Sequence, residues 1–302
     1  MKEILPEIDR WKEDGEKVVV ATVVATRRSA PRPVGSVLGV SAGGELAGSV
    51  SAGCVENEVY AEAQEVLAGG APRRLTYGIT DEQAYGVGLP CGGEIDVYVA
   101  KADAGLLRSV VEEIGRGRVV TVEPSGDGLS IASRPAPRLV VVGAIDTAEA
   151  LCRGAKSLGW TAIVVDPRAR WATAERVPSA DEIVVEWPDE ALTRLAPDEG
   201  TAVVVLAHED RIDLPALQLA LASDAFFVGA IGSRKTQARR REALLELGLD
   251  ESAIERIHGP VGLDVGAESP AETAVAILAE VLAVRAGRDG GPLRERTDRI
   301  HA

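Results

Sequence analysis

The sequence has few of the residues that crosslink secreted proteins or build zinc sites. Its 302 residues include only three cysteines, Cys54, Cys91 and Cys152, and three histidines. Three cysteines cannot form a disulfide framework, and their spacing matches no zinc-binding pattern. Taken singly, each cysteine is most often a reduced thiol in the core, so only the surroundings can distinguish a functional one.

Long hydrophobic runs are also missing. Runs such as residues 18–24 are far too short to cross a bilayer, and residues 1–14 are charged and lack the apolar core of a signal peptide. Acidic residues outnumber basic ones, 47 to 33, which gives a formal net charge of −14. That balance argues against nucleic acid or an anionic membrane as a partner. We therefore expect a cytoplasmic protein without a membrane span.

The first part of the chain has the pattern of short strands with few helices. Apolar segments bounded by proline and glycine turns predict strands at residues 18–25, 36–40, 45–51, 73–77, 94–100 and 118–122. One helix is predicted where Val55, Val59, Ala63 and Val66 recur at helical spacing. We assign these elements to an N-terminal α+β domain of residues 1–124.

The pattern then changes. Residues 125–137 are polar and end in Arg-Pro-Ala-Pro, which predicts a linker. Across residues 138–302, continuous apolar strands alternate with helices, and strands are expected at residues 139–142, 161–165, 183–185, 202–206 and 226–228. This alternation predicts a parallel sheet covered on both faces, so the fold class is α/β with a C-terminal Rossmann-like domain.

The last long helix has a clear start signal. Ser269 can cap it, Pro270 fits the first helical position and Glu272 completes a capping box. The helix is expected to run to about residue 286.

The cysteines differ in their surroundings. Cys54 lies where a strand runs into the predicted helix, and unpaired N–H groups at a helix N-terminus favour a thiolate. The neighbouring Gly53 permits a sharp turn and lets a ligand approach the backbone. Cys91 lies in a glycine-dense loop, residues 86–93, which can turn several N–H groups toward an anion. Cys152 falls inside a helix and is expected in the core.

A third loop, residues 27–36, carries three arginines in an otherwise acidic protein, Arg27, Arg28 and Arg32. It is either a solvated loop or an anion-binding loop for a phosphate or a pterin-type polar ring.

The turn after the first Rossmann strand departs from the dinucleotide pattern. A working fingerprint reads G-x-G-x-x-G, and here only Gly143 of the three glycines is present. Ile145 places a branched side chain where a pyrophosphate would approach, and Asp146 adds negative charge. Asp166 ends the next strand, where a ribose-binding acid would sit, although an aspartate is common there. The turn thus argues against ordinary NAD(P) binding.

A second anion site is predicted at residues 229–235. The segment follows a strand and opens a helix, and its glycines with Arg234 and Lys235 would suit a phosphate. The arginines of residues 239–241 follow on the same helix and are either part of that site or a solvated basic face.

Several segments together resemble the successive motifs of the XdhC/CoxI family. They are SAPRPVGS (29–36), GSVSAGCVE (48–56), GVGLPCGG (86–93), VVDPR (164–168), VGAIGSRK (228–235) and HGPVGLDVGA (258–267). The resemblance runs in order from about residue 18 to residue 286, and several ordered motifs are far more specific than one short pattern.

That family consists of accessory factors for xanthine dehydrogenase and related molybdenum hydroxylases. The resemblance implies binding of the molybdenum cofactor, as molybdopterin or its dinucleotide form, and its protection while a cysteine desulfurase or other sulfurtransferase installs the sulfido ligand. It further implies delivery to the hydroxylase apoenzyme and, by analogy alone, a homodimer. The two motif cysteines of the family map to Cys54 and Cys91, as molybdenum ligands or sulfur carriers, and soft ligands suit both elements.

These motifs and the predicted anion sites together give further candidate cofactor contacts. They are Pro31, Gly35, Ser36, Ser51, Gly53, Glu56, Gly88, Gly92, Gly93, Gly143, Asp166, Arg168, Gly229, Gly232, Ser233, Arg234 and Lys235.

Two other functions stay open beside this cofactor chaperone. The parallel-sheet half suggests an NAD(P)-dependent oxidoreductase with an atypical turn, but no nucleophile-and-base pair is evident. The chain could instead be an adaptor that docks a hydroxylase and a sulfurtransferase without a small molecule, although the glycine-rich thiol loops would then lack a purpose. We predict a binding protein rather than a catalyst.

Overall fold

The computed structural model describes residues 4–27, 30, 32–78, 93–115, 120–123, 131–133 and 135–296. The chain forms two compact units, one of residues up to Pro135 together with those from Arg296 on, and one from Ala136 to Glu295. The predicted linker, residues 125–137, is described only in part, and a short strand, β7 (Ile131–Ser133), lies within it. No helix in the described part of the chain has the length and apolar character needed to span a membrane.

The N-terminal unit is built on a five-stranded antiparallel sheet. Side by side, its strands are β3 (Leu46–Gly48), β2 (Val37–Ser41), β1 (Val18–Arg27), β5 (Glu94–Lys101) and β4 (Arg73–Gly78). The predicted strands of this region are confirmed to within a few residues. The segment predicted at residues 118–122 is a separate short strand, β6 (Val120–Val122), which pairs with β7.

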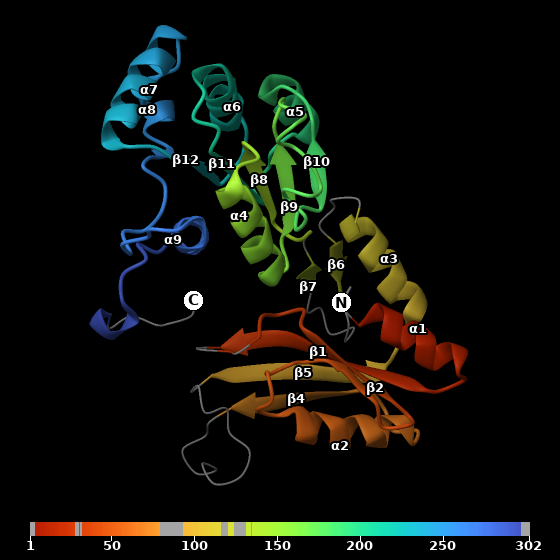
Figure 1. Ribbon diagram of the computed structural model, residues 1–302. Coiled ribbons are helices and arrows are strands. Elements are labelled where there is room, and N and C mark those ends of the chain that lie inside the picture. The colour runs from red at the N-terminus through yellow and green to blue at the C-terminus, as the bar shows by residue number, and fades with distance from the viewer. Residues whose placement is uncertain are drawn as a thin grey trace. The chain divides into compact units, whose positions relative to one another are not determined.

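Helices cover both faces of this sheet (Figure 1). The predicted helix is α2 (Glu56–Leu67), whose Val59, Ala63 and Val66 pack in one core cluster with the strands β1, β2 and β5. On the opposite face, α1 (Leu5–Glu13) packs its Ile8 and Trp11 against β1 and β2. Because both faces are covered, the central strand β1 is buried over most of its length.

Sequence analysis does not predict α1 or α3 (Ala104–Gly115). The charged residues of the first segment obscure Ile4, Ile8 and Trp11, whose spacing is helical and whose side chains are all buried.

The second unit has a parallel sheet, as predicted, and its six strands include one that the sequence analysis does not predict, β13. Side by side, its strands are β10 (Glu182–Val184), β9 (Thr161–Val165), β8 (Arg138–Val142), β11 (Thr201–Val205), β12 (Phe227–Ala230) and β13 (Ile257–His258). The strand order reverses at β8, which lies between β9 and β11. In open α/β sheets such a switch point is where ligands bind, at the carboxyl ends of the strands.

Two layers of helices cover this sheet. The helices α4 (Asp146–Ser157) and α9 (Pro270–Arg285) pack on one face. The helices α5 (Pro188–Leu195), α6 (Asp210–Ala222), α7 (Arg234–Glu246) and α8 (Glu251–Ile254) contribute to the core of the other. The capping box of α9 is confirmed, because the Ser269 hydroxyl accepts from the Glu272 N–H while the Glu272 carboxylate accepts from the Ser269 N–H.

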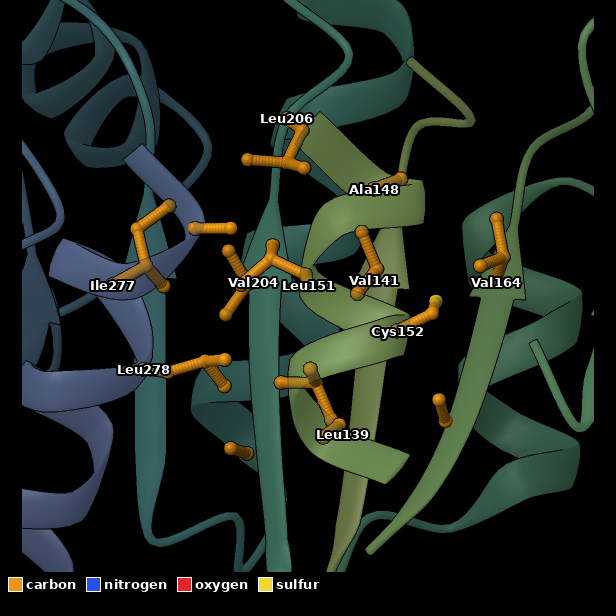
Figure 2. Close-up of a cluster of buried hydrophobic side chains, with 14 of the residues drawn as sticks. Leu139, Val141, Ala148, Leu151, Cys152, Val164, Val204, Leu206, Ile277 and Leu278 are labelled. Atoms are coloured by element: carbon orange, nitrogen blue, oxygen red, sulfur yellow. The ribbon is translucent and has the colours of Figure 1, made fainter. Parts of the chain in front are cut away.

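Cys152 belongs to the core beneath α4, as expected. Figure 2 shows it among the apolar side chains of α4, β8 and β9, including Leu151, Val141 and Val164. Burial, together with the charge of Glu149, raises the pKa of the Cys152 thiol to about 12. This thiol is therefore a packing residue.

The arginines of residues 239–241 are not a free basic face, because each one pairs with an acid. Arg240 is buried and its Nη2 lies 2.9 Å from the Oδ2 of the equally buried Asp213. Arg239 pairs with Asp210 at 2.9 Å on the surface, and Arg241 pairs with Glu251.

Arg239 and Arg240 allow the contribution of an exposed ion pair to stability to be compared with that of a buried one. Arg240→Met leaves the Asp213 carboxylate buried without its cation and is expected to lower the free energy of unfolding by about 3–5 kcal/mol. Arg239→Met removes an exposed pair and is expected to cost less than about 1 kcal/mol. Urea denaturation measures both variants. Equal, small losses would contradict a structural role for the buried pair.

Candidate functional site

The sequence motifs of the N-terminal unit come from one end of its sheet. The arginine loop, residues 27–36, leaves β1 at Arg27, and the Cys54 loop leaves β3 at Gly48. The segment that contains Cys91 connects Gly78 at the end of β4 with Glu94 at the start of β5. The strand register brings these ends together, since Glu94 lies opposite both Arg27 and Gly78. The Cys54 loop leaves from the same end of the sheet, but from β3, which is the edge strand opposite β4.

Several predicted site residues lie outside the described part of the chain. They are Pro31, Gly88, Cys91 and Gly92. Of their neighbours, Gly35 has a positive φ of 88° in the turn before β2, and Gly93 is buried at the start of β5.

Cys54 is half-buried and packs on the core cluster under α2. Ala30, from the arginine loop, and Tyr77, from the end of β4, pack on the same cluster. Burial, with the nearby carboxylates of Glu62 and Glu58, raises the pKa of Tyr77 to about 12. Sequence reasoning missed Tyr77, because only the strand register shows that it lies at this end of the sheet.

Glu56 organises the loop around Cys54. Its Oε1 accepts from the Ser49 hydroxyl at 2.6 Å and from the Ser51 N–H at 2.9 Å. Its Oε2 accepts from the Ser51 hydroxyl at 2.5 Å and from the Gly53 N–H at 2.8 Å. The Ser51 hydroxyl in turn accepts from the Cys54 and Val55 N–H groups. Ser51 and Glu56 are thus engaged within the loop, and their contact with a cofactor stays a prediction.

The turn before Cys54 needs unusual backbone angles. Ala52 and Gly53 have positive φ values of 58° and 107°. A Cβ built on Gly53 would meet nothing within 4 Å, so the backbone there is open on one side. An approaching ligand would find space at Gly53, as the sequence suggests.

Arg27 is exposed at the end of β1 and is held by two acids of β5. It pairs with Glu94 and with Asp96, whose buried carboxylate also accepts from Arg74 at 2.7 Å and from Thr76 at 2.8 Å. The sequence signal for this ion-pair cluster is Asp96, a single aspartate within the apolar strand β5. The sequence analysis does not use that signal.

In the second unit, the acid expected to bind ribose is already occupied. Asp166 is fully buried and accepts from the Ala144 N–H at 2.8 Å and from the Arg168 Nη2 at 2.6 Å. The guanidinium of Arg168 also donates to Glu209 at 2.6 Å. Burial pushes the pKa of Asp166 up, but the bonds from Arg168 and Ala144 outweigh it and lower the pKa.

This chain of ion pairs crosses the switch point. Asp166 and Arg168 follow β9 and Glu209 follows β11, so the link spans the turn after β8, which lies between them. The guanidinium of Arg168 also lies 5.2 Å from the ring centre of Trp171. Packing within the protein is enough to explain a glycine at position 143, because a Cβ there would lie only 2.7 Å from the backbone nitrogen of Ala207. These residues do not fit a dinucleotide such as NAD(P).

The loop between β12 and α7 leads into two exposed basic residues at the start of α7. Ser233 caps α7 by accepting from the Thr236 N–H at 3.1 Å, and Gly232 has a φ of 134°. Arg234 and Lys235 are exposed and form no ion pair with the described residues. A Cβ on Gly229 would lie 2.6 Å from the side chain of Val261 and 2.7 Å from that of Phe227, so close packing explains the glycine at this position.

His258 forms a pair that sequence reasoning missed. Its Nδ1 lies 2.9 Å from the Oε1 of Glu280 on α9, and its ring stacks on Phe227 at 4.5 Å. The other Glu280 oxygen accepts from the Gly262 N–H at 2.6 Å, so the glutamate ties the loop after β13 to α9.

Comparison with known proteins agrees with this two-unit architecture. The family model described as the XdhC and CoxI family matches residues 11–78, and the model described as the XdhC Rossmann domain matches residues 139–281. The chain belongs to the XdhC/CoxI family.

Relatives of this XdhC/CoxI member include two curated bacterial proteins. The molybdenum cofactor insertion chaperone PaoD of Escherichia coli is 29% identical over 290 residues, which covers 90% of this chain and 84% of PaoD. A probable xanthine dehydrogenase subunit of Bacillus subtilis is 24% identical over 324 residues, which covers 92% of this chain and 96% of that protein.

A solved structure shares the fold. It is a crystal structure from Bacillus halodurans described as a xanthine dehydrogenase, with a TM-score of 0.73 and 22% identity. The match covers 97% of this chain and 96% of that chain, and it supports the fold alone.

The Glu56 network predicts a pH dependence of stability. Burial pushes the pKa of Glu56 up, but the bonds from Ser49 and Ser51 outweigh it and hold the pKa at about 2, below the ordinary 4.5. The ionised form therefore stabilises the fold fully above about pH 4.5, and this contribution is lost as the pH falls toward 2. The melting temperature of Glu56→Gln should lie below that of the wild type at neutral pH, and the gap should narrow in acid.

Scanning calorimetry across that pH range measures the gap. Glu58→Gln is the control, since its carboxylate accepts none of the loop bonds. A gap of constant size at every pH would contradict the assignment.

Because the Asp166 carboxylate is already engaged within the chain, we expect NAD⁺ and NADH to give no binding heat in calorimetry at about millimolar concentration. Arg168→Met is expected to lose about 3–5 kcal/mol of stability and to gain no nucleotide affinity, because Asp166 is then buried without its cation. Arg170→Met changes an exposed arginine and should alter stability by less than about 0.5 kcal/mol. Binding of either nucleotide by the wild type at about micromolar affinity would show the crevice to be open.

Proposed function

We propose that this protein binds the molybdenum cofactor, protects it during sulfuration and delivers it to an apo molybdenum hydroxylase of the xanthine dehydrogenase or CO dehydrogenase type. The observation that carries the proposal is that Ala30 of the arginine loop and Tyr77 at the end of β4 pack on the same core cluster as the half-buried Cys54. The similarity to a chaperone named for molybdenum cofactor insertion supports it.

The residues at this sheet end fit the cofactor by their chemistry. A thiolate is a soft ligand and would suit a molybdenum centre that carries sulfur ligands. We assign this contact to Cys54 and Cys91, either as metal ligands or as sulfur carriers. The cofactor would supply the metal centre, while Gly35, Ser36 and Gly53 would let its polar rim approach the backbone.

The second unit, taken by itself, offers fewer candidate contacts. Asp166 is hydrogen-bonded to Ala144 and Arg168, and Gly143 packs closely on Ala207. These contacts within the protein argue against binding of a pyrophosphate or ribose there. Ser233, Arg234 and Lys235 stay as candidate contacts for a phosphate of molybdopterin or of its dinucleotide form, together with Gly229 and Gly232.

The proposed cycle needs two partners, the hydroxylase apoenzyme and a cysteine desulfurase or other sulfurtransferase. We place the cycle in the cytoplasm and infer that the protein acts as a homodimer. The alternative oxidoreductase function is disfavoured by the occupied Asp166. The alternative adaptor function would need the partners but no cofactor.

The test is cofactor retention after co-expression with the enzymes of cofactor synthesis. Wild-type protein is expected to carry molybdenum by mass spectrometry and an oxidised pterin by fluorescence. Cys54→Ser and Cys91→Ser should each lower retention by about tenfold or more, because a hydroxyl is a poor ligand for a soft metal. Cys152→Ala is the control, since that thiol lies in the core.

Full retention in both Cys54→Ser and Cys91→Ser would refute the thiol assignment. Wild-type protein that captures a hydroxylase but carries no pterin or metal would favour the adaptor.

A further inference from the structure

The N-terminal unit contains a cavity that is separate from the site around Cys54. Its volume is about 150 Å³, and its walls come from β1, β5, α3 and β6. Leu106 lines the cavity although it is 44% exposed, so the cavity reaches the surface beside α3. Most of the remaining wall is apolar and is formed by Val20, Ala100, Ala102, Leu107, Val110 and Val122.

The cavity and the Cys54 site lie on opposite faces of the sheet. Consecutive side chains of a strand point to opposite faces. Val19 and Val97 belong to the core cluster under α2, on which Cys54 packs, whereas the next residues along the two strands, Val20 and Tyr98, line the cavity. A ligand in the cavity would therefore be separated from the Cys54 loop by the sheet itself.

Thr22 and Tyr98 add two hydroxyl groups to the apolar lining. The two residues lie opposite each other in the register of β1 and β5, so their side chains are neighbours on one face of the sheet. Thr22 is only 9% exposed. Neither hydroxyl forms a hydrogen bond with another residue in the described part of the chain. Because buried hydroxyls are normally paired, the cavity offers two hydrogen-bonding groups that the protein itself does not use.

The charge and size of the cavity indicate the class of ligand. Its charged lining residues are Lys101 and Asp103, whose opposite charges cancel, so a neutral ligand is favoured. The Asp103 carboxylate is also engaged at the start of α3, where its Oδ1 accepts from the Leu106 N–H at 2.9 Å. An apolar cavity of about this volume can hold one benzene-sized ring. Since a hydroxyl group can donate or accept, Thr22 and Tyr98 suit either a hydroxyl or a carbonyl group of a ligand.

We propose that this cavity binds a neutral, ring-sized molecule with one hydroxyl or carbonyl group, which bonds to the hydroxyls of Thr22 and Tyr98 while the ring packs on the apolar walls. The proposal goes beyond cofactor handling and does not depend on it, because no residue of the cavity belongs to the proposed cofactor site. A molecule held between the sheet and α3 stabilises the folded unit, since it binds the native state alone.

The test uses the full chain without cofactor and takes phenol as the probe at about pH 7, where phenol is neutral. Titration followed by methyl NMR should give a dissociation constant of about 1 mM or lower, with shifts at Val20 and Val110. Toluene has nearly the same size but no hydroxyl, and it should bind at least about fivefold more weakly, because it leaves Thr22 and Tyr98 unpaired. Benzoate should also bind more weakly than phenol, because its charge would have to be buried.

The results that would overturn the proposal are equally direct. The proposal is wrong if phenol causes no shift at about 10 mM, if toluene binds as tightly as phenol, or if benzoate binds more tightly than phenol.

Thr22→Val removes one hydroxyl and keeps nearly the same shape. Its affinity for phenol should fall by about fivefold, while its affinity for toluene should not fall. Thr26→Val is the matched control, since it removes a hydroxyl from the same strand outside the cavity, and it should bind phenol as the wild type does. Equal affinity for phenol in Thr22→Val and the wild type would contradict the bond to Thr22.

Two further variants keep the test decisive if Thr22→Val fails to fold. Tyr98→Phe removes the second hydroxyl and should weaken phenol binding by a similar factor. Ala100→Leu fills the cavity and should abolish the binding of both phenol and toluene. Unchanged phenol binding in Ala100→Leu would place the molecule elsewhere on the protein and refute the site.

Discussion

The loop before α2 depends on one constraint, which is that backbone N–H groups turned away from water need an acceptor. From residue 49 to residue 55 each N–H group has one, supplied by Val37, Glu56 or a serine hydroxyl. A loop with positive φ at Ala52 and Gly53 would otherwise sample many conformations. Because one carboxylate collects most of these bonds, the position of Cys54 follows from the position of Glu56.

The same principle operates at the switch point of the second unit. Its sequence suggests a ribose-binding acid, but Asp166 receives its donors from Arg168 and Ala144 instead of from ligand hydroxyls. In both units, a place that a sequence motif marks for a ligand is partly filled by the chain's own charged side chain. A motif therefore marks where donors or acceptors converge, and only the hydrogen bonds show which group they serve.

Much of the fold could be predicted, because apolar alternation and turn residues are local signals. The predicted strand at residues 161–165 matches β9 to the residue, and the capping box at Ser269 begins α9 as expected. The features that the sequence does not predict depend on contacts between segments that are distant in the chain or on side-chain conformation. Asp166 looks available until the conformation of Arg168 is known, and only the register of β4 with β5 places Tyr77 at the end of the sheet from which the Cys54 loop leaves. Sequence spacing contains neither fact.

A protein that hands a cofactor on faces opposing demands, which the Cys54 loop can meet. Release requires that few contacts be strong, while selectivity requires that those few be well placed, and a prearranged loop lowers the entropy that binding must overcome. With its N–H groups already bonded to Glu56, this loop offers a bound group little besides one thiol and the open backbone at Gly53. If the proposed function holds, the rigidity of the site comes from the protein, and transfer of the cofactor has to break few contacts with this loop.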